Sequence, residues 1–182
     1  KGGVVVALSA DHGFMPLPEA TERRDPKGGR NRVRDVTIAK ALNEAVDAEL
    51  KRPAGATPLV YRLEGCSLWL DRAALAAKGA PSAKRVMAIV RHELATTWKD
   101  IVLETFIVDG AFRERGKDEI ELRAWNARVP GRSGDLFVVP RYGVLVDPYD
   151  GKGSSHGTPW EFDTHVPMVL WGAGIAPRVL SA

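Results

Sequence analysis

An aspartate and a histidine stand side by side in the stretch "LSADHGFMPLPE" at residues 8–19, directly after an apolar run and directly before a glycine. Adjacent residues of an extended strand point to opposite faces, so Asp11 and His12 can serve one metal ion only where the strand has ended and the backbone bends. Gly13 permits that bend. A carboxylate and an imidazole begin a zinc site, but such a site needs three or four ligands. The pair is therefore either a polar turn or one part of a metal site.

A second segment of similar character, "SSHGTPWEFDTHVP", occupies residues 154–167 and leads into another apolar run. It offers two further candidate ligands, His156 and His165. A lone histidine is more often structural or exposed than metal-bound, but two such segments, each touching one end of a predicted strand, favour a metal site. In this segment Asp163 is expected to cap or brace the loop.

Taken in order, "LSADHGFMPLPE", "RSGDLFVVPRYGVLV" and "SSHGTPWEFDTHVPMVLWGAGI" resemble the C-terminal part of the alkaline phosphatase superfamily. More narrowly, they resemble the branch of bacterial alkaline phosphatases that is close to the type I phosphodiesterase/nucleotide pyrophosphatases. The middle of the chain carries no motif of the family. The resemblance implies a zinc-dependent phosphate-ester hydrolase, with monoesters favoured over diesters because the closing "DTHVPMVLWG" is nearer the alkaline phosphatase branch.

The resemblance also implies roles for individual residues. Members of the family bind two zinc ions, which hold and polarise the phosphoryl group while a serine or threonine attacks phosphorus. Asp11 and His12 match the pair that binds the zinc activating the nucleophile. His156 matches a ligand of the other zinc, which activates water in the second step. His165 is the alternative to His156 as a ligand, or else a histidine that orients the loop.

The family pattern further requires an aspartate, the nucleophile and an Asp-x-x-x-His unit ahead of the "ADHG" block. Ten residues precede Asp11, and none is an aspartate, histidine or threonine. We therefore predict that the 182 residues are the C-terminal portion of a longer enzyme and are inactive alone. The predicted partners are the missing N-terminal part and a phosphate ester. The alternatives are a sulfatase or phosphonate hydrolase of the same superfamily, or a non-catalytic structural or interaction domain.

Composition limits the other classes of function. Apolar residues make up 45% of the chain and charged residues 27%, as in ordinary globular proteins. No apolar run approaches the roughly 20 residues of a membrane span, and no signal peptide is recognisable. The charged stretches at 22–35 and 112–119 alternate in sign, which indicates solvated loops and not nucleic-acid binding. Cys66 is expected to be a small buried residue. By resemblance, the location is periplasmic or secreted.

The pattern of apolar residues predicts an α/β fold: part of a mainly parallel sheet flanked by helices, alkaline phosphatase-like, with a small α+β insertion in the middle. We expect one domain over 1–182, with residues 53–130 as an insertion or cap region. Two strands buried on both faces are expected near the ends of the chain. The other expected elements are a loop from Pro16 to about Arg34, helices at 36–52, from Ser82 and at 118–128, a hairpin around Gly65, a turn at "RSGD" (132–135) in which Ser133 and Asp135 bond to the backbone, and two strands joined around Arg141.

Overall fold

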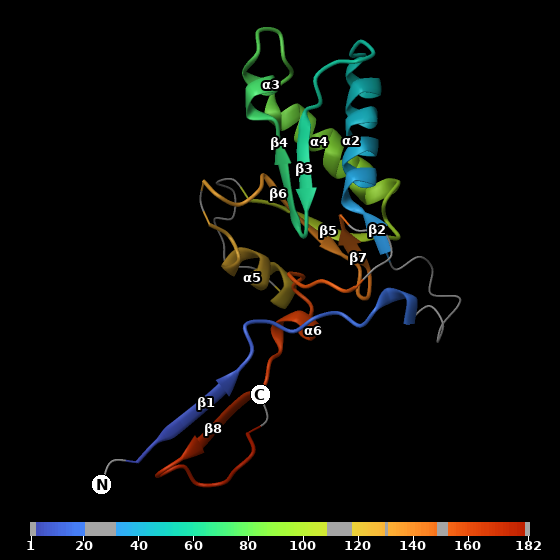
Figure 1. The fold of residues 1–182 in the computed structure, drawn as a ribbon. Helices are drawn as coiled ribbons and strands as arrows, with labels where there is room; N and C mark the ends of the chain where they lie inside the picture. The colour runs from blue at the N-terminus through green and yellow to red at the C-terminus, as the bar shows by residue number, and fades with distance from the viewer. Residues whose placement is uncertain (1–2, 21–31, 109–117, 130, 149–152, 181–182) are drawn as a thin grey trace.

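The computed structural model describes residues 3–20, 32–108, 118–129, 131–148 and 153–180. Helices and a four-stranded sheet form the larger part of the chain, and a two-stranded ribbon extends from it, as Figure 1 shows. The α/β class expected from the sequence is confirmed. The strand pairs are mostly antiparallel in the part of the chain that the structure describes, whereas the sequence indicated a mainly parallel sheet; the parallel pair is β2 (Arg32–Arg34) with β7 (Leu145–Asp147).

The four-stranded sheet has the order β3-β4-β6-β5, and all its neighbours are antiparallel. The expected hairpin is confirmed as β3 (Val60–Glu64) and β4 (Ser67–Leu70), joined through Gly65 in the left-handed region. β5 spans Val102–Ile107 and β6 spans Leu136–Pro140. Because β6 lies outside residues 53–130, the predicted insertion region shares its sheet with the C-terminal third of the chain.

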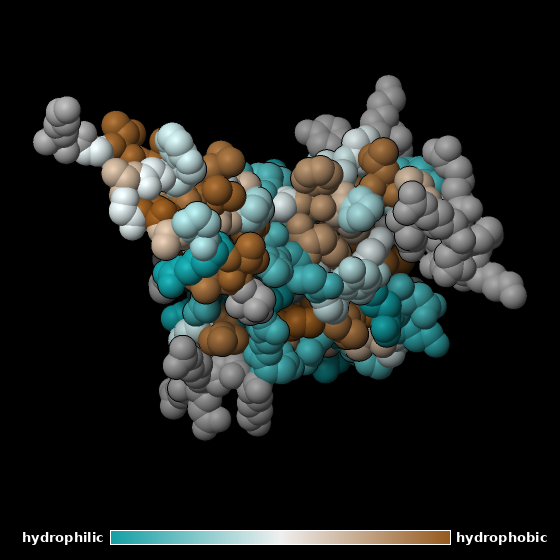
Figure 2. Space-filling model, turned by 90° about the horizontal axis from the view of Figure 1, so that it is seen from below, coloured by the Kyte–Doolittle hydropathy of each residue, from teal (hydrophilic) through white to brown (hydrophobic). Residues whose placement is uncertain are grey.

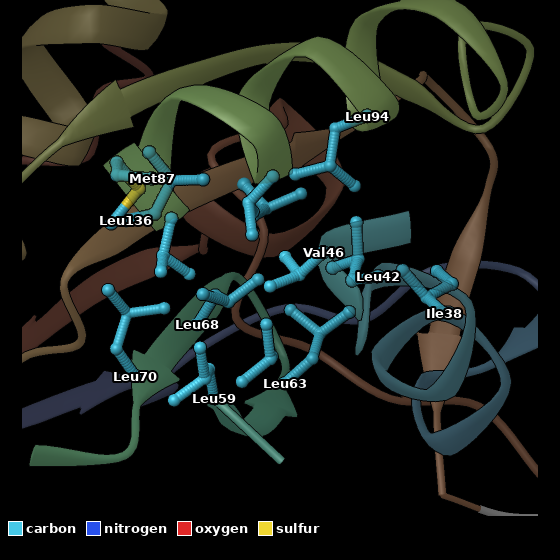
Figure 3. Close-up of a cluster of buried hydrophobic side chains, with 14 of the residues drawn as sticks. Ile38, Leu42, Val46, Leu59, Leu63, Leu68, Leu70, Met87, Leu94 and Leu136 are labelled. Carbon is cyan, nitrogen blue, oxygen red and sulfur yellow. The ribbon is translucent and has the colours of Figure 1, made fainter. Parts of the chain in front are cut away.

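Two amphipathic helices build the main core against this sheet. α2 (Asp35–Leu50) buries Ile38, Leu42 and Val46, and α4 (Ala83–Thr96) buries its own apolar stripe. Apolar residues three and four positions apart lie on one face of a helix, which is why both helices were predictable. Figure 3 shows their side chains interleaved with those of the hairpin.

Local capping explains where the helices begin. Ser82 Oγ accepts a hydrogen bond from the N–H of Arg85 at the start of α4. Asp71 and Asp118 act in the same way for α3 (Arg72–Ala76) and α5 (Glu119–Asn126). None of the helices in the described ranges is both long and apolar enough to cross a bilayer.

The first and last strands differ from expectation. β1 (Val5–Ser9) pairs antiparallel with β8 (Met168–Gly172), with Ala7 opposite Leu170. Both strands were expected to be buried on both faces, but their apolar side chains are exposed. The runs have the composition of strands that are buried on both faces. Among the described residues each strand pairs only with the other, and the exposure of their side chains shows that neither face is covered by these residues. We call this pair the β1–β8 ribbon.

Candidate metal centre

The structure brings together two histidines from opposite ends of the chain. Asp11 and His12 follow the end of β1, and His156 lies in the segment that precedes α6 (Glu161–Thr164). The rings of His12 and His156 are stacked, with centroids 3.5 Å apart and planes 13° apart. Both segments adjoin the β1–β8 ribbon, one at the end of β1 and the other ahead of β8.

A carboxylate oxygen of Asp11 and a ring nitrogen of His12, the atoms that could bind a metal, lie near each other. The Nδ1 atom of His12 lies 2.7 Å from the carbonyl oxygen of Gly13. Because a carbonyl can only accept, Nδ1 carries the proton in this contact, and Nε2 keeps a lone pair. Nε2 is 3.7 Å from Oδ2 of Asp11. Two ligands at 2.0–2.1 Å from a tetrahedral ion lie about 3.3 Å apart, so these two atoms fit one zinc ion after a small adjustment.

Backbone contacts hold the two histidine segments against each other. The N–H of Gly13 donates to the carbonyl of Asp163 at 2.9 Å, and the N–H of Met15 donates to the carbonyl of Ser155 at 3.3 Å. The hydroxyl of Ser154 also donates to the carbonyl of Met15. At Gly13 a Cβ would lie 2.0 Å from the carbonyl oxygen of Phe162. The glycine after His12 is thus required for close approach of the segments.

Asp163 braces the second segment, as the sequence suggested. Its Oδ2 accepts hydrogen bonds from the backbone N–H of Thr158 at 2.7 Å and from the Thr158 hydroxyl at 2.6 Å. The residue is 5% exposed. Its other oxygen, Oδ1, is buried and has no hydrogen-bond partner among the described residues.

His165 differs from His156 in its surroundings. Both residues are exposed, but the backbone N–H of His165 donates to the carbonyl of Glu161 at the end of α6. The stacking partner of His12 is His156. The geometry therefore favours His156 over His165, although the identity of the ligands stays a prediction.

Aromatic side chains attach the same segment to the large sheet. The indole N–H of Trp160 donates to the carbonyl of Pro140 at 3.0 Å. Tyr142 lies edge-on to both Trp160 and Phe162, with centroids 5.4 Å apart in each pair. The position of the His156 segment is thereby linked to the end of β6.

Arg32 is a further residue that holds this region, and sequence reasoning missed it. Its guanidinium forms ion pairs at 2.6 Å with Glu19 and with the buried Asp147, and it donates to the carbonyl of Gly153 at 2.6 Å. The hydrogen bond to Glu19, supported by the charge of Asp147, raises the pKa of Arg32 despite its burial. Arg32 thus fastens the start of the His156 segment to β7 and to the chain that follows His12.

The charged stretch at 22–35 was interpreted as solvated, and this is wrong for two of its residues. The side chain of Arg32 is 10% exposed, and Asp35 is 5% exposed. Their partners lie far along the chain or in the adjoining helix backbone, so a local pattern of alternating charge does not reveal them. Residues 21–31 lie outside the described part of the chain.

The "RSGD" motif has a structural role in this arrangement. Ser133 Oγ accepts from the N–H of Val129 at 2.8 Å, and Asp135 accepts from the N–H of Leu70 at 2.7 Å and from Arg72. A Cβ on Gly134 would lie 2.5 Å from the carbonyl oxygen of Leu68. The predicted turn is confirmed, and it fixes β6 against β4.

No group of three or more His, Cys, Asp or Glu side chains is arranged to hold a metal ion within the ranges that the structure describes. Asp11, His12 and His156 nevertheless have the donor chemistry that zinc prefers, which is carboxylate oxygen and imidazole nitrogen. They would fit a metal centre only together with further ligands.

No protein-family model matches the chain. Individual curated proteins do. Alkaline phosphatase PafA of Elizabethkingia meningoseptica is 26% identical over 177 residues, which are 96% of this chain and 30% of the relative. Alkaline phosphatase PhoK of Sphingomonas sp is 28% identical over an alignment of 186 positions, which covers 96% of this chain and 32% of the relative. A calcium-transporting ATPase of Myroides odoratus is 26% identical over 179 residues, 97% of this chain and 31% of the relative.

Solved structures give the same result. The crystal structure of wild-type alkaline phosphatase PafA matches 94% of this chain with a TM-score of 0.72 at 26% identity, and 30% of that chain is covered. A mutant of PafA matches 91% of this chain and 29% of its own, with a TM-score of 0.69 at 24% identity. The chain therefore spans about a third of the length of the relatives it matches.

Proposed function

Because the chain belongs to the alkaline phosphatase superfamily, we propose that it supplies part of the metal centre of a phosphate-ester hydrolase. The observation that carries this proposal is the stacking of His12 on His156, with Asp11 beside His12. Metal-ligating residue types from two distant segments meet at one place, next to the ribbon.

The stacking supports two metal ions and not one. The lone pair of an imidazole nitrogen lies in the plane of its ring, and zinc binds there at about 2.0–2.1 Å. The ring planes of His12 and His156 are 13° from parallel, and the ring centroids are 3.5 Å apart. A single ion therefore cannot lie in both ring planes at bonding distance from both rings. In two-metal hydrolases the ions lie about 3.5–4 Å apart. We propose that Asp11 and His12 bind one zinc and His156 the other.

When bound, zinc ions act as Lewis acids on the phosphoryl oxygens and lower the pKa of bound water. The contribution of this chain is to hold three of their ligands in place. The hydrogen bond from Nδ1 of His12 to the carbonyl of Gly13 fixes the ring and leaves Nε2 for the ion. The contacts of Gly13 and Met15 with the other segment set where His156 stands.

Further ligands and the nucleophile belong, in this proposal, to another part of the full-length protein. The β1–β8 ribbon offers the surface for it, because the ribbon exposes large apolar side chains on both faces. Figure 2 views the molecule from the end that carries the ribbon and shows hydrophobic residues gathered there. Within the two strands the most exposed large apolar residues are Met168 (76%), Trp171 (70%) and Leu8 (64%), and Val4, directly before β1, is 72% exposed. Exposed apolar patches of this kind mark interaction surfaces, and we propose that another part of the same protein covers this one.

The substrate class is proposed as phosphate monoesters, with phosphodiesters and nucleotide pyrophosphates as the second choice. Sulfate esters and phosphonates are the alternative within the superfamily. We propose a periplasmic or secreted location, since this agrees with the resemblance to bacterial alkaline phosphatases.

The proposal is tested on the full-length protein with an aryl phosphate monoester, the matching diester and the matching sulfate ester. We expect the fastest turnover with the monoester, loss of turnover after chelation, and its return with zinc. His12→Ala should abolish it. His92→Ala is the matched control, because His92 is an exposed histidine on α4. Full activity of His12→Ala, or no hydrolysis of any ester by the zinc-loaded wild type, would refute the proposal.

The isolated 182 residues are tested separately. With too few ligands for either ion, we expect them to bind zinc weakly and to leave the aryl phosphate intact. Zinc-dependent turnover by this chain alone would mean that the centre is complete without another segment.

A further inference from the structure

Asp163 joins the two histidine segments through separate groups of one residue. Its backbone carbonyl accepts a hydrogen bond from Gly13, the residue after His12, at 2.9 Å. Its side-chain Oδ2 accepts two hydrogen bonds from Thr158, two residues after His156, at 2.7 and 2.6 Å. The distance between the segments therefore depends on how this one residue is held.

The short helix α6 places these groups. The N–H of Asp163 donates to the carbonyl of Trp160 at 3.0 Å, which fixes its backbone within the helical turn. The neighbouring carbonyl, that of Phe162, lies where a Cβ of Gly13 would be. The backbone of α6 thus contacts the "ADHG" segment, while the carboxylate of Asp163 contacts the loop that carries His156.

The burial of Asp163 is costly for a residue that serves folding alone. The residue is 5% exposed, and Oδ1 has no hydrogen-bond partner among the described residues. An unsatisfied buried carboxylate oxygen opposes folding. The two other buried aspartates with long-range contacts are paired with arginines, Asp135 with Arg72 and Asp147 with Arg32. The structure describes no ion pair for Asp163.

We infer that Asp163 is a positioning residue for the proposed metal centre: it holds the His156 loop at the separation from His12 that two neighbouring ions require. This inference rests on the function proposed above. Without the carboxylate, the two hydrogen bonds that Thr158 donates are lost, and the loop is less firmly held next to His156. The imidazole then no longer stands in a fixed position relative to His12, and the metal ions lose affinity. Residues that orient metal ligands typically change metal affinity by about 10–100-fold when they are removed.

The test measures the zinc dissociation constant of the full-length protein by competition with a chelating dye. We expect Asp163→Ala to weaken zinc binding by about 10–100-fold. His156→Ala is the reference for loss of a ligand. Asp135→Ala is the matched control, because it removes another buried aspartate that accepts a backbone hydrogen bond, but at the contact of β4 with β6. Its zinc affinity should stay close to that of the wild type even if its thermal stability falls.

Two milder variants address a failure of Asp163→Ala to fold. Asp163→Asn keeps an oxygen that can accept both hydrogen bonds from Thr158, so we expect zinc affinity close to that of the wild type. Thr158→Val removes the hydroxyl donor and keeps the shape, so we expect a smaller loss than with Asp163→Ala. Thermal unfolding of each variant in excess chelator shows whether the metal-free protein is folded.

The outcomes separate the two proposals. If the wild type binds no zinc, or His156→Ala binds it like the wild type, the proposed metal centre fails. If His156→Ala loses zinc while Asp163→Ala binds zinc normally, only the positioning role is overturned. If Asp163→Ala does not fold, normal zinc binding by Thr158→Val overturns the positioning role instead. Asp163→Asn binding as poorly as folded Asp163→Ala would also overturn it, because the bracing hydrogen bonds would then not be what matters.

Discussion

The imidazole rings of His12 and His156 lie face to face, 3.5 Å apart between centroids, although one residue follows the first strand and the other precedes the last. Between them the chain builds the four-stranded sheet, the helices α2 and α4 and most of the core. The two rings meet because β1 and β8 pair antiparallel, so that the end of β1 adjoins the beginning of β8.

This relationship predicts how metal content responds to single substitutions. If the near-parallel rings serve different ions, His12→Ala and His156→Ala should each lower the metal content of the full-length protein from about two ions to about one. Activity should fall by more than about 100-fold in both, since removing a ligand costs more than removing a group that orients it. Metal analysis by mass spectrometry after dialysis measures the content. Loss of both ions from either variant would show instead that the sites are coupled or shared.

Arg32 provides a prediction about stability. Arg32→Ala should lower the free energy of unfolding by about 1.5–3 kcal/mol, because it removes a charge-assisted hydrogen bond to the buried Asp147. Arg62→Ala is the control: its pair with Glu64 has the same 2.6 Å separation but is half-exposed, so it should cost less than about 1 kcal/mol. Urea denaturation of both variants gives the comparison. Equal effects of the two substitutions would show that the ion pair of Arg32 is unimportant for stability.

Much of the larger part of the fold follows from local sequence. The apolar spacing in α2 and α4 and the caps at Ser82 and Asp118 act over a few residues, so the helices could be placed. The burial of β1 and β8 could not be predicted in this way. Three consecutive valines show what environment a strand prefers, but what covers it is decided by segments elsewhere.

In the candidate site, too, local sequence identifies some residues, whereas others depend on contacts with distant segments. His12 and His156 could be singled out because each stands before a glycine in a polar segment next to an apolar run. Arg32 could not, because each of its partners is distant: Glu19, Asp147 and the carbonyl of Gly153. In a stretch rich in arginine, nothing local distinguishes the one that becomes buried.

Cys66 offers a probe of the native state. Burial raises the pKa of its thiol to about 12, with a further contribution from the charge of Asp163. The thiolate is the reactive form, so the native protein should resist a thiol reagent at pH 8 and react once unfolded in urea. Labelling over time, followed by mass spectrometry, measures both states. Rapid labelling without denaturant would contradict the buried position.

Glu104 leads to a prediction about pH. Desolvation, followed by the carboxylates of Asp118 and Glu121, raises its pKa above the ordinary 4.5, while Arg91 lowers it. The folded state then binds this proton more tightly than the unfolded state, so the contribution of Glu104 to stability is present below pH 4.5 and is lost as the pH rises through the raised value.

Glu104→Gln should therefore have little effect on stability near pH 4 and should raise stability at pH 7, as measured by urea midpoints at both values. Glu44→Gln is the control, because this glutamate on α2 lies 3.7 Å from Lys40 and would lose a weak attraction. A destabilising effect of Glu104→Gln at pH 7 would contradict desolvation as the main cause of the raised pKa.

The β1–β8 ribbon also affects how the chain can be handled in solution. Each strand keeps one edge of N–H and C=O groups that the partner strand does not pair, and both faces are apolar, which is the combination that promotes aggregation. The ribbon carries the ends of the two segments that bear Asp11, His12 and His156. Self-association of the isolated chain would thus begin beside the residues proposed to bind metal, and polar substitutions on the ribbon should raise its solubility.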